Sequence, residues 1–249
     1  MDKIYINKKD GNQLAALLEL PVNPQYLIIV CHGFLGGKEN RGKIFPFTTK
    51  LTAAGFGVLA FDFTGAGESN GEFASVTLTR QVNDLQTVIS YANAEIKLPI
   101  ILLGRSFGGS TIIGLSNYES AVGYIFWSTP IELIKTFSTI LKDKYKQLKA
   151  GIPVNIIEQD TTYELKPDLV ADFKKINLLQ SLKALESKPV LICHGLADEV
   201  VDFQNAVYMH EKLPKSTLRL IAGADHSFTD FIQSREELTL EWLKATFVK

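Results

Sequence analysis

One serine of the chain lies in a pentapeptide whose residue types favour nucleophilic catalysis. Gly104-Arg105-Ser106-Phe107-Gly108 follows an apolar run that ends at Leu103, and it precedes a helical pattern over 109–117. Glycines on both sides of a serine let the chain turn sharply, so that the hydroxyl stands exposed at a helix N-terminus. A glycine-rich turn with a merely exposed serine is the structural alternative. We expect Ser106 to act as a nucleophile.

A serine is a weak nucleophile without a base, and the chain has four histidines. His32 and His194 each end an apolar run and precede a glycine, so we expect packed side chains there. His210 lies within a helical stretch and is most simply a surface or packing residue. His226 lies in the polar loop Gly223–Phe228, between an apolar run and the last helical pattern. Elimination therefore favours His226 as the base, with an ordinary loop histidine as the alternative.

A third group must hold the imidazole in the correct tautomer and stabilise its cation. Asp198 follows a short apolar run, where a strand is expected to end. Asp202 is better explained as the N-cap of the helix that follows it. Asp225 is adjacent to the candidate base and would usually project elsewhere. The order serine, aspartate, histidine along the chain is one known for such triads, and it favours Asp198.

Acyl transfer also needs hydrogen-bond donors for the oxyanion of the tetrahedral intermediate. The backbone N–H of Phe107 directly follows the candidate nucleophile. A second donor is expected from a loop after an early strand, and His32-Gly33-Phe34-Leu35-Gly36-Gly37 occupies that place. We expect the N–H of Phe34 to be this donor; a plain glycine turn is the alternative.

These residues require a sheet to position them, and the apolar runs predict one. The runs are continuous and lack polar alternation, which is typical of parallel strands covered on both faces. A helical pattern over 78–94 separates two of these runs, and another over 230–247 follows the last run. The sequence therefore predicts an α/β fold with helices on both faces of a mostly parallel sheet. The expected strands are 26–31, 57–61, 99–103, 122–126, 189–193 and 217–221.

Two segments depart from this alternation. Residues 4–20 read as a β-hairpin that forms an antiparallel edge of the sheet. Residues 131–187 are far longer than the usual connection of about 2–6 residues, so we expect an inserted cap, or lid, within a single domain over 1–249. In the cap we expect one helix over 133–148, a hairpin over 154–165 and helical structure over 167–185.

The composition and the apolar runs of the sequence limit the classes of partner and the cellular location that we expect. The chain has 249 residues with 26 Lys and Arg against 27 Asp and Glu, which argues against a general nucleic-acid binder. No apolar run approaches the roughly 18 residues of a membrane span, and the N-terminal residues lack a secretory pattern, so we expect a cytoplasmic protein without a membrane partner. Cys31 and Cys193 lie in apolar runs and are expected to be buried, reduced thiols.

No motif indicates a metal or a cofactor. In Cys31-His32 and Cys193-His194 the adjacent side chains point to opposite faces of a strand, so neither pair can act together on one ion. Gly36-Gly37-Lys38 and Gly65-Ala66-Gly67 match neither a phosphate-binding loop nor a dinucleotide-binding loop. We expect neither a metal nor a cofactor.

The motifs together resemble those of the α/β-hydrolase superfamily, and within it the bacterial cinnamoyl (feruloyl) esterases most closely. The resemblance implies an eight-stranded sheet, a Ser106–His226–Asp198 triad, an oxyanion hole from Phe34 and Phe107, and no cofactor. In those esterases the cap resembles a small lid that holds the phenolic end of the substrate; Gln159, Asp160 and Tyr163 lie in the corresponding region. One departure is Phe107, where the esterases usually carry glutamine. The motifs are His32-Gly33-Phe34, Asp62-Phe63-Thr64-Gly65-Ala66-Gly67-Glu68-Ser69, the pentapeptide at Ser106, His194-Gly195-Leu196-Ala197-Asp198 and Ala224-Asp225-His226.

The expected function is that of a serine carboxylesterase acting through an acyl-enzyme on Ser106. Its substrates would be small or medium acyl or aryl esters, with hydroxycinnamoyl (feruloyl) esters among the candidates. A peptidase, an aminopeptidase-like enzyme or a thioesterase could use the same triad. A non-catalytic binding module on the same scaffold is the alternative from another class. The expected partner is a small-molecule ester, and a homodimer stays open.

Overall fold

A computed structural model of the chain describes residues 1–115, 121–158 and 160–248. Its centre is an eight-stranded sheet with the strand order β1-β2-β4-β3-β5-β6-β9-β10. The strands β4, β3, β5, β6, β9 and β10 pair in parallel, whereas β1 pairs with β2, and β2 with β4, in antiparallel fashion. The strands are β1 (Asp2–Asn7), β2 (Gln13–Glu19), β3 (Tyr26–Cys31), β4 (Phe56–Phe61), β5 (Ile100–Arg105), β6 (Ala121–Trp127), β9 (Val190–Gly195) and β10 (Ser216–Ile221).

The expected strands and the edge hairpin are confirmed. Every residue of β4 and β9 is buried, as a strand covered on both faces requires. Residues 2–19 form the predicted hairpin, which closes the parallel sheet at one edge through β2. The sequence-based expectation of an eight-stranded, mostly parallel sheet is therefore correct.

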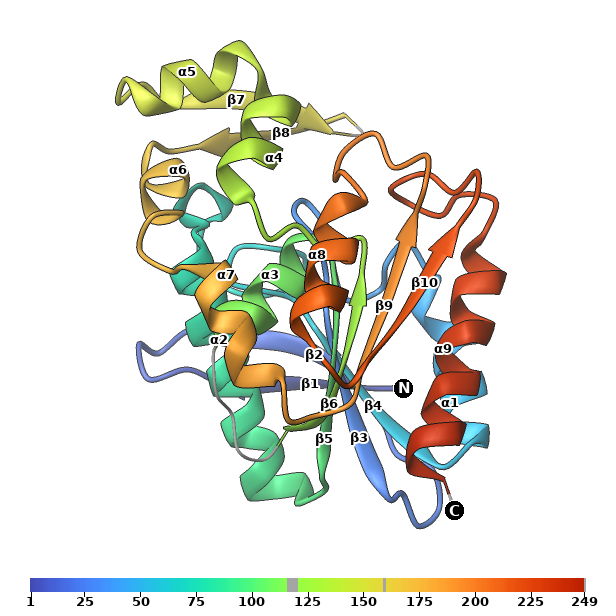
Figure 1. Cartoon of the computed structure of the whole chain (residues 1–249). Helices are drawn as coiled ribbons and strands as arrows, with labels where there is room; N and C mark the ends of the chain where they lie inside the picture. Colours follow the sequence, from blue (N-terminus) through green and yellow to red (C-terminus); the bar gives the residue numbers. More distant parts are fainter. Residues whose placement is uncertain (116–120, 159, 249) are drawn as a thin grey trace.

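Helices cover both faces of the sheet (Figure 1). One hydrophobic cluster includes Phe47 and Leu51 of α1 and Leu243 of α9, and a second includes Leu85 of α2 and Met209 of α8. The helical segments are α1 (Ile44–Ala53), η1 (Phe73–Ser75), α2 (Leu78–Tyr91), the π-helical turn η2 (Ala92–Ile96), α3 (Phe107–Gly114), α8 (Gln204–Lys212) and α9 (Ile232–Phe247).

The segment between β6 and β9 first rises above the end of the sheet, and its last helical turns return alongside α3 (Figure 1). Its hairpin β7–β8 is confirmed, but the single helix expected over 133–148 is wrong. Lys142 has φ +51° and ψ −121°, which ends one helix and begins the next. The segment contains α4 (Leu133–Leu141), α5 (Asp143–Lys149), β7 (Val154–Glu158), β8 (Thr161–Leu165), α6 (Asp168–Asp172), α7 (Leu178–Ser181) and η3 (Leu182–Leu185).

Aromatic side chains join this segment to the sheet. The ring of Phe137 on α4 lies 5.1 Å from that of Phe34, 5.3 Å from that of Phe107 and 4.8 Å from that of Phe173, measured between centroids. Within the described part of the chain, no helix has the length and apolar character needed to cross a membrane. Within that same part, no three His, Cys, Asp or Glu side chains are grouped as metal ligands would be.

Candidate active site

Ser106 occupies a strained turn between β5 and α3. Its φ of +51° and ψ of −124° lie outside the regions that most residues adopt. The turn is tight because a Cβ on Gly108 would lie 2.3 Å from the carbonyl oxygen of Cys31. A Cβ on Gly104 would lie 2.5 Å from the Cα of Gly109. Glycine at these positions lets α3 approach β3 and β5 closely enough to hold the serine at the helix N-terminus.

The structure brings Ser106, His226 and Asp198 together. Their side chains come from the β5–α3 turn, the loop after β10 and the loop after β9. The Oγ of Ser106 lies 3.1 Å from Nε2 of His226, and Nδ1 of His226 lies 2.9 Å and 3.1 Å from the two carboxylate oxygens of Asp198. An ionised carboxylate only accepts, so Nδ1 carries the proton and Nε2 is left to accept from the serine hydroxyl.

Asp198 is a fully buried carboxylate held by four donors. Its Oδ1 accepts the N–H groups of Val200 at 2.9 Å and Val201 at 2.8 Å, and its Oδ2 lies 3.1 Å from Nε2 of His194. Burial alone would raise the pKa of this carboxyl, but the hydrogen bonds from His194 and His226 and the backbone hold it well below its usual value. Asp198 is therefore a stable anion facing the imidazole.

His194 is a site residue that the sequence did not single out. It is buried, as expected of a packed residue, but its Nε2 lies between Oδ2 of Asp198 and the carbonyl oxygen of Val201, at 3.1 Å and 2.9 Å. Both neighbours are acceptors, so Nε2 carries a proton and donates. The four-residue spacing between His194 and Asp198 is the only sequence signal of this contact.

The competing carboxylates and histidines are engaged elsewhere. Asp225 accepts from the N–H and the hydroxyl of Thr229 at 2.7 Å and 2.6 Å, and Asp202 accepts from the N–H of Gln204 at the start of α8. His32 is buried and accepts the N–H of Phe63 on Nε2. His210 contacts the hydroxyl of Ser216. None of these groups contacts Ser106.

Two backbone N–H groups beside Ser106 are available as donors. Those of Phe34 and Phe107 make no hydrogen bond to any described residue. Both residues line the same cavity as Ser106, and their rings lie 6.1 Å apart in an edge-on arrangement. The loop that carries Phe34 is closed by a hydrogen bond from the N–H of Gly36 to the carbonyl of Gly33.

A buried ion pair fixes the far side of that loop. The carboxylate of Asp62 accepts from the backbone N–H and the Nζ of Lys38, at 2.6 Å and 2.8 Å. Nζ of Lys38 also pairs with Glu68 at 2.6 Å. A Cβ on Gly67 would collide with the Asp62 carboxylate at 2.2 Å. The motif that begins at Asp62 thus positions the Phe34 loop.

A cavity of about 620 Å³ lies above Ser106 and His226. Its aromatic and aliphatic wall includes Phe34, Phe137, Ile140 and Tyr163. Of the three cap residues singled out from the sequence, Tyr163 lines the cavity, Asp160 is exposed and not part of the lining, and Gln159 lies outside the described residues.

Comparisons with known proteins identify the family and the fold of the chain. The profile of a family described as "Serine aminopeptidase, S33" (Hydrolase_4) matches residues 22–153, more than half of the chain. The chain belongs to this family. The α/β-hydrolase resemblance is likewise confirmed, because solved structures of that fold superpose over nearly the whole chain.

Among relatives of this S33 family member, the uncharacterized protein YfhR of Salmonella typhi is 26% identical over 244 residues, covering 90% of this chain and 74% of that protein. An uncharacterized 31.7 kDa protein of Escherichia coli is 35% identical over 100 residues, 39% of this chain. This chain spans 34% of the length of that protein, and 56% of the α/β hydrolase domain-containing protein 17C of Xenopus tropicalis.

Two solved structures show the extent of the structural similarity. Est1E of Butyrivibrio proteoclasticus with ferulic acid bound superposes with a TM-score of 0.82 at 25% identity, over 99% of this chain and 100% of that chain. The esterase PF2001 of Pyrococcus furiosus superposes with a TM-score of 0.74 at 21% identity, over 98% and 90% of the two chains.

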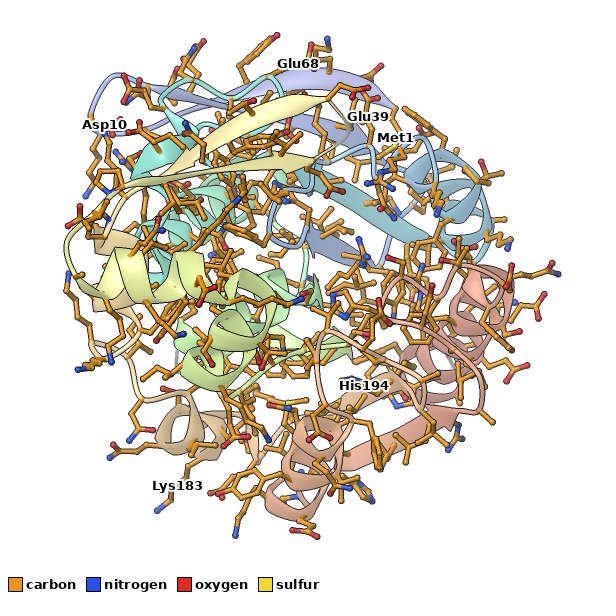
Figure 2. The ribbon with its side chains drawn as sticks, turned by 90° about the horizontal axis from the view of Figure 1, so that it is seen from above. Met1, Asp10, Glu39, Glu68, Lys183 and His194 are labelled. Carbon is orange, nitrogen blue, oxygen red and sulfur yellow. The ribbon has the colours of Figure 1, made fainter. Side chains whose placement is uncertain are left out.

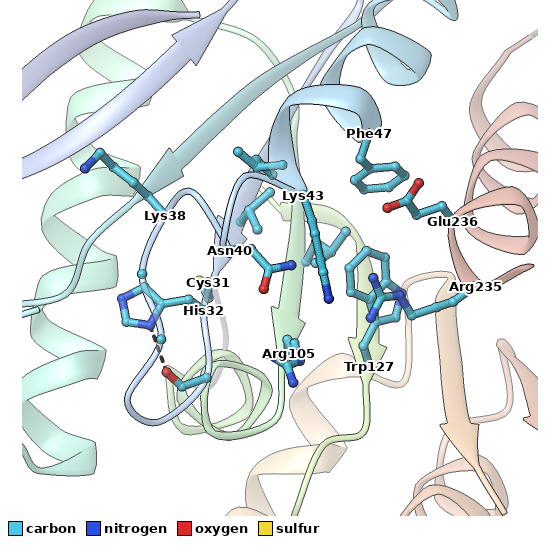
Figure 3. Close-up of a pocket in the computed structure, with 16 residues that line it drawn as sticks. Cys31, His32, Lys38, Asn40, Lys43, Phe47, Arg105, Trp127, Arg235 and Glu236 are labelled. Atoms are coloured by element: carbon cyan, nitrogen blue, oxygen red, sulfur yellow. Dashed lines mark hydrogen bonds between the residues drawn. The ribbon is translucent and has the colours of Figure 1, made fainter. Parts of the chain in front are cut away.

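In this family member, cationic side chains form the other wall of the cavity: Arg41, Lys43, Arg105 and Arg235. Arg41 pairs with Glu158 of the cap hairpin at 3.1 Å, and Arg105 donates to the hydroxyl of Ser227 at 3.1 Å. Figure 3 shows Lys43, Arg105 and Arg235 around Trp127. The sequence did not reveal this group, because its members come from three segments, of which the first and last are 194 residues apart.

Proposed function

We propose that this protein is a serine carboxylesterase that hydrolyses small or medium acyl or aryl esters through an acyl-enzyme on Ser106. One observation carries the proposal: Asp198, His226 and Ser106 form a continuous hydrogen-bonded series that ends at the floor of a cavity. A binding module on the same scaffold has no need of this alignment.

The chemistry follows from the geometry. His226 Nε2 removes the proton of Ser106 as Oγ attacks the ester carbonyl, and the N–H groups of Phe34 and Phe107 bind the resulting oxyanion. The intermediate collapses as the carbon–oxygen bond to the alcohol breaks, and His226 gives its proton to the leaving oxygen. Water, deprotonated by the same Nε2, then attacks the acyl-enzyme and releases the acid and the free serine. Asp198 stabilises the imidazolium in both halves.

The cavity favours an aryl or aliphatic acyl group. Phe34 and Tyr163 both contact the ring of Phe73, at 5.7 Å and 4.9 Å between centroids, which extends the aromatic wall toward the cap. The similarity to Est1E, a structure with ferulic acid bound, supports hydroxycinnamoyl (feruloyl) esters as candidate substrates. We assign Tyr163 to this acyl-binding wall.

The family description favours an aminopeptidase as the second candidate. An aminopeptidase must recognise the α-ammonium group of its substrate, which calls for an acidic side chain near the nucleophile. Among the described residues that line the cavity, Glu158 is the one carboxylate, and it is paired with Arg41. Four cations around the same cavity would repel an ammonium group, so the charges favour an ester over a peptide.

Replacement of Ser106 by alanine tests the proposal. Wild type should hydrolyse p-nitrophenyl butyrate and take up a fluorophosphonate probe, whereas Ser106→Ala should lose both activities and keep its circular dichroism spectrum. A Ser110→Ala variant, which alters a buried serine of the same helix, controls for loss of a hydroxyl. Hydrolysis by Ser106→Ala at the wild-type rate would overturn the assignment.

A panel of kcat/KM values separates the candidate activities. Methyl ferulate, p-nitrophenyl esters of increasing chain length, an acyl-CoA and an aminoacyl p-nitroanilide represent esterase, thioesterase and aminopeptidase substrates. We expect the ester with an aryl or medium acyl group to have the highest value. A clear preference for the anilide would instead establish the aminopeptidase.

A further inference from the structure

We infer that Lys43, Arg105 and Arg235 form an anion-binding subsite on the leaving-group side of Ser106, and that the preferred esters carry a carboxylate or phosphate on their alcohol part. This inference rests on the proposed esterase function and names a substrate class for it. Three observations carry it: a recess between the cations, their lack of an acidic partner, and their position relative to His226.

A recess of about 40 Å³ adjoins the main cavity beside these cations. The two spaces share the lining residues Gly36, Lys43, Arg105 and Arg235, so a group in the recess can belong to a molecule whose ester lies at Ser106. Water needs only about 10–15 Å³ of such space, so the recess holds a group of a few heavy atoms. Figure 3 shows Lys43 and Arg235 reaching toward this space from different elements.

Glu236 also lines the recess, but within the described part of the chain none of the three cations forms a salt bridge. No carboxylate lies within salt-bridge distance of Lys43, Arg105 or Arg235 there. Arg235 is 2% exposed, its Nε has no hydrogen-bond partner, and the neighbouring Glu236 is paired with Lys50. A buried cation without a counter-charge is costly, and an oxyanion supplies both the charge and the acceptors that are missing.

The protonation behaviour of the arginines agrees with this excess of positive charge. Burial and the nearby Arg105 lower the pKa of Arg235 to about 10. Burial and the charge of Arg41 also lower the pKa of Arg105, while the charges of Asp198 and Asp225 act in the opposite direction. An anion between the guanidinium groups would relieve their mutual repulsion.

The position of the cations indicates which part of the ester they bind. Arg105 donates to Ser227, the residue after His226, and Arg235 comes from α9, which follows the His226 loop. The leaving oxygen must lie near Nε2 of His226 to receive its proton. The part of the aromatic wall formed by Phe137 and Tyr163 belongs to the cap, which lies on the other side of the molecule from α9 when viewed from above (Figure 2). The anion therefore belongs to the alcohol, and the apolar group to the acid.

A matched set of esters tests the inference. The compounds are 4-butanoyloxybenzoate, 4-butanoyloxyphenyl phosphate and the neutral 4-butanoyloxybenzamide, which share one acyl group. Each kcat/KM is divided by the rate constant for hydroxide-catalysed hydrolysis of the same ester, so that intrinsic reactivity cancels. We expect one or both anions to be preferred over the amide by about tenfold to a hundredfold, as charge-assisted hydrogen bonds allow. The two anionic arms show whether the subsite favours a carboxylate or a phosphate.

Lys43 is half-buried at the start of α1, which makes it the least disruptive of the three to change. Lys43→Gln should reduce the anion-to-amide ratio by about fivefold or more, and Lys43→Arg should retain it. Lys183→Gln makes the same change of charge at an exposed position on the rim of the molecule (Figure 2), and it should leave the ratio unchanged. An unchanged ratio in Lys43→Gln would overturn the inference.

Two further measurements distinguish the other outcomes. A preference for monomethyl succinate over methyl succinamate, without one in the first set, would place the anion on the acid and overturn the assignment. Equal corrected kcat/KM values for charged and neutral esters would overturn the anion-binding subsite but not the proposed esterase activity. If no ester is hydrolysed, the esterase proposal fails. Calorimetric titration with 4-hydroxybenzoate and 4-hydroxybenzamide then tests the anion-binding subsite by itself. Tighter binding of the anion supports the subsite, and equal binding overturns it.

Discussion

At the scale of single residues, the carboxylate of Asp198 has the most demanding environment in the site. It accepts from two backbone N–H groups and from two imidazoles, in a position fully shielded from solvent. An asparagine side chain at this position has only one oxygen that can accept these hydrogen bonds, and its NH2 group would face another donor. It would therefore favour the tautomer of His226 that has its proton on Nε2, which cannot accept from Ser106.

We predict that Asp198→Asn lowers kcat/KM for p-nitrophenyl butyrate by about 10³–10⁴-fold, through loss of the correct tautomer and of the charge. Asp225→Asn is the matched control, because it changes the carboxylate adjacent to His226, whose bonds go to Thr229. Steady-state kinetics on both variants measure the effect. A drop of comparable size in Asp225→Asn, or activity near wild type in Asp198→Asn, would contradict the assigned role.

Sequence reasoning reached Ser106, His226 and Asp198 because each lies in a short motif and because few histidines had to be weighed. The structure places these three within hydrogen-bond distance, and their catalytic roles stay predictions. His194 and the cationic wall were out of reach for a different reason. The contact of His194 with Asp198 spans four residues but depends on the path of the loop after β9, which no local pattern specifies. The cations come from distant segments, and a lone arginine on a helix such as α9 carries no local pattern that distinguishes it from a surface residue.

At the scale of elements, the close approach of α3 to β3 positions the nucleophile. The expected Cβ of an alanine at Gly108 meets two backbone carbonyl oxygens, at 2.3 Å and 2.4 Å, which cannot move without moving the strand. We predict that Gly108→Ala lowers the free energy of unfolding by about 3 kcal/mol or more, beyond the ordinary range of overpacking. Urea denaturation followed by circular dichroism measures this change.

Gly114→Ala provides the comparison within the same helix. Its Cβ would meet a flexible methyl group of Val82 at 3.2 Å, and alanine favours a helix over glycine by about 1 kcal/mol, so the two effects roughly cancel. Equal destabilisation by the two substitutions would show that the steric limit at Gly108 is not what fixes the elbow.

The strands were predictable because a short, continuous run of β-branched and aliphatic residues between turn residues favours a buried strand. The break between the two helices at Lys142 was not predictable from the sequence, because lysine is a good helix former and the apolar stripe continues across it. What divides α4 from α5 is tertiary: α4 packs Phe137 against Phe34 and Phe107, while α5 packs near β7. Helix propensity depends on the local sequence and does not reflect such a change of packing partner.

At the scale of the whole molecule, we propose that the chain unfolds as one domain, with 131–187 as a cap within it. One hydrophobic cluster includes Phe137, Leu165 and Phe173 of the cap together with Leu102 and Phe126 of the sheet. The backbone N–H and the hydroxyl of Thr79 both donate to the carboxylate of Asp172, which also joins α2 to α6. We predict a single calorimetric transition whose van't Hoff and calorimetric enthalpies agree. Two resolved transitions would instead identify the cap as a separate folding unit.

The net charge of −1 describes the chain as a whole and conceals how charge is distributed. Positive side chains are gathered along one wall of the cavity, where Arg41 is paired with Glu158 but Lys43, Arg105 and Arg235 form no salt bridge within the described residues. Composition disfavours a general polyanion-binding surface, but it has no bearing on a local group of cations, because only the fold brings them together.

The surroundings of Trp127 make its fluorescence sensitive to a bound ligand. The guanidinium of Arg235 lies 3.8 Å from its ring centroid, the ring of Phe47 lies 5.5 Å away, and its N–H donates to Thr239. Since the chain has two tryptophans, replacing Trp242 with phenylalanine would leave a single indole beside the cavity. Its emission would then respond to any ligand that displaces the guanidinium, which gives the protein an intrinsic optical reporter of occupancy without an added label.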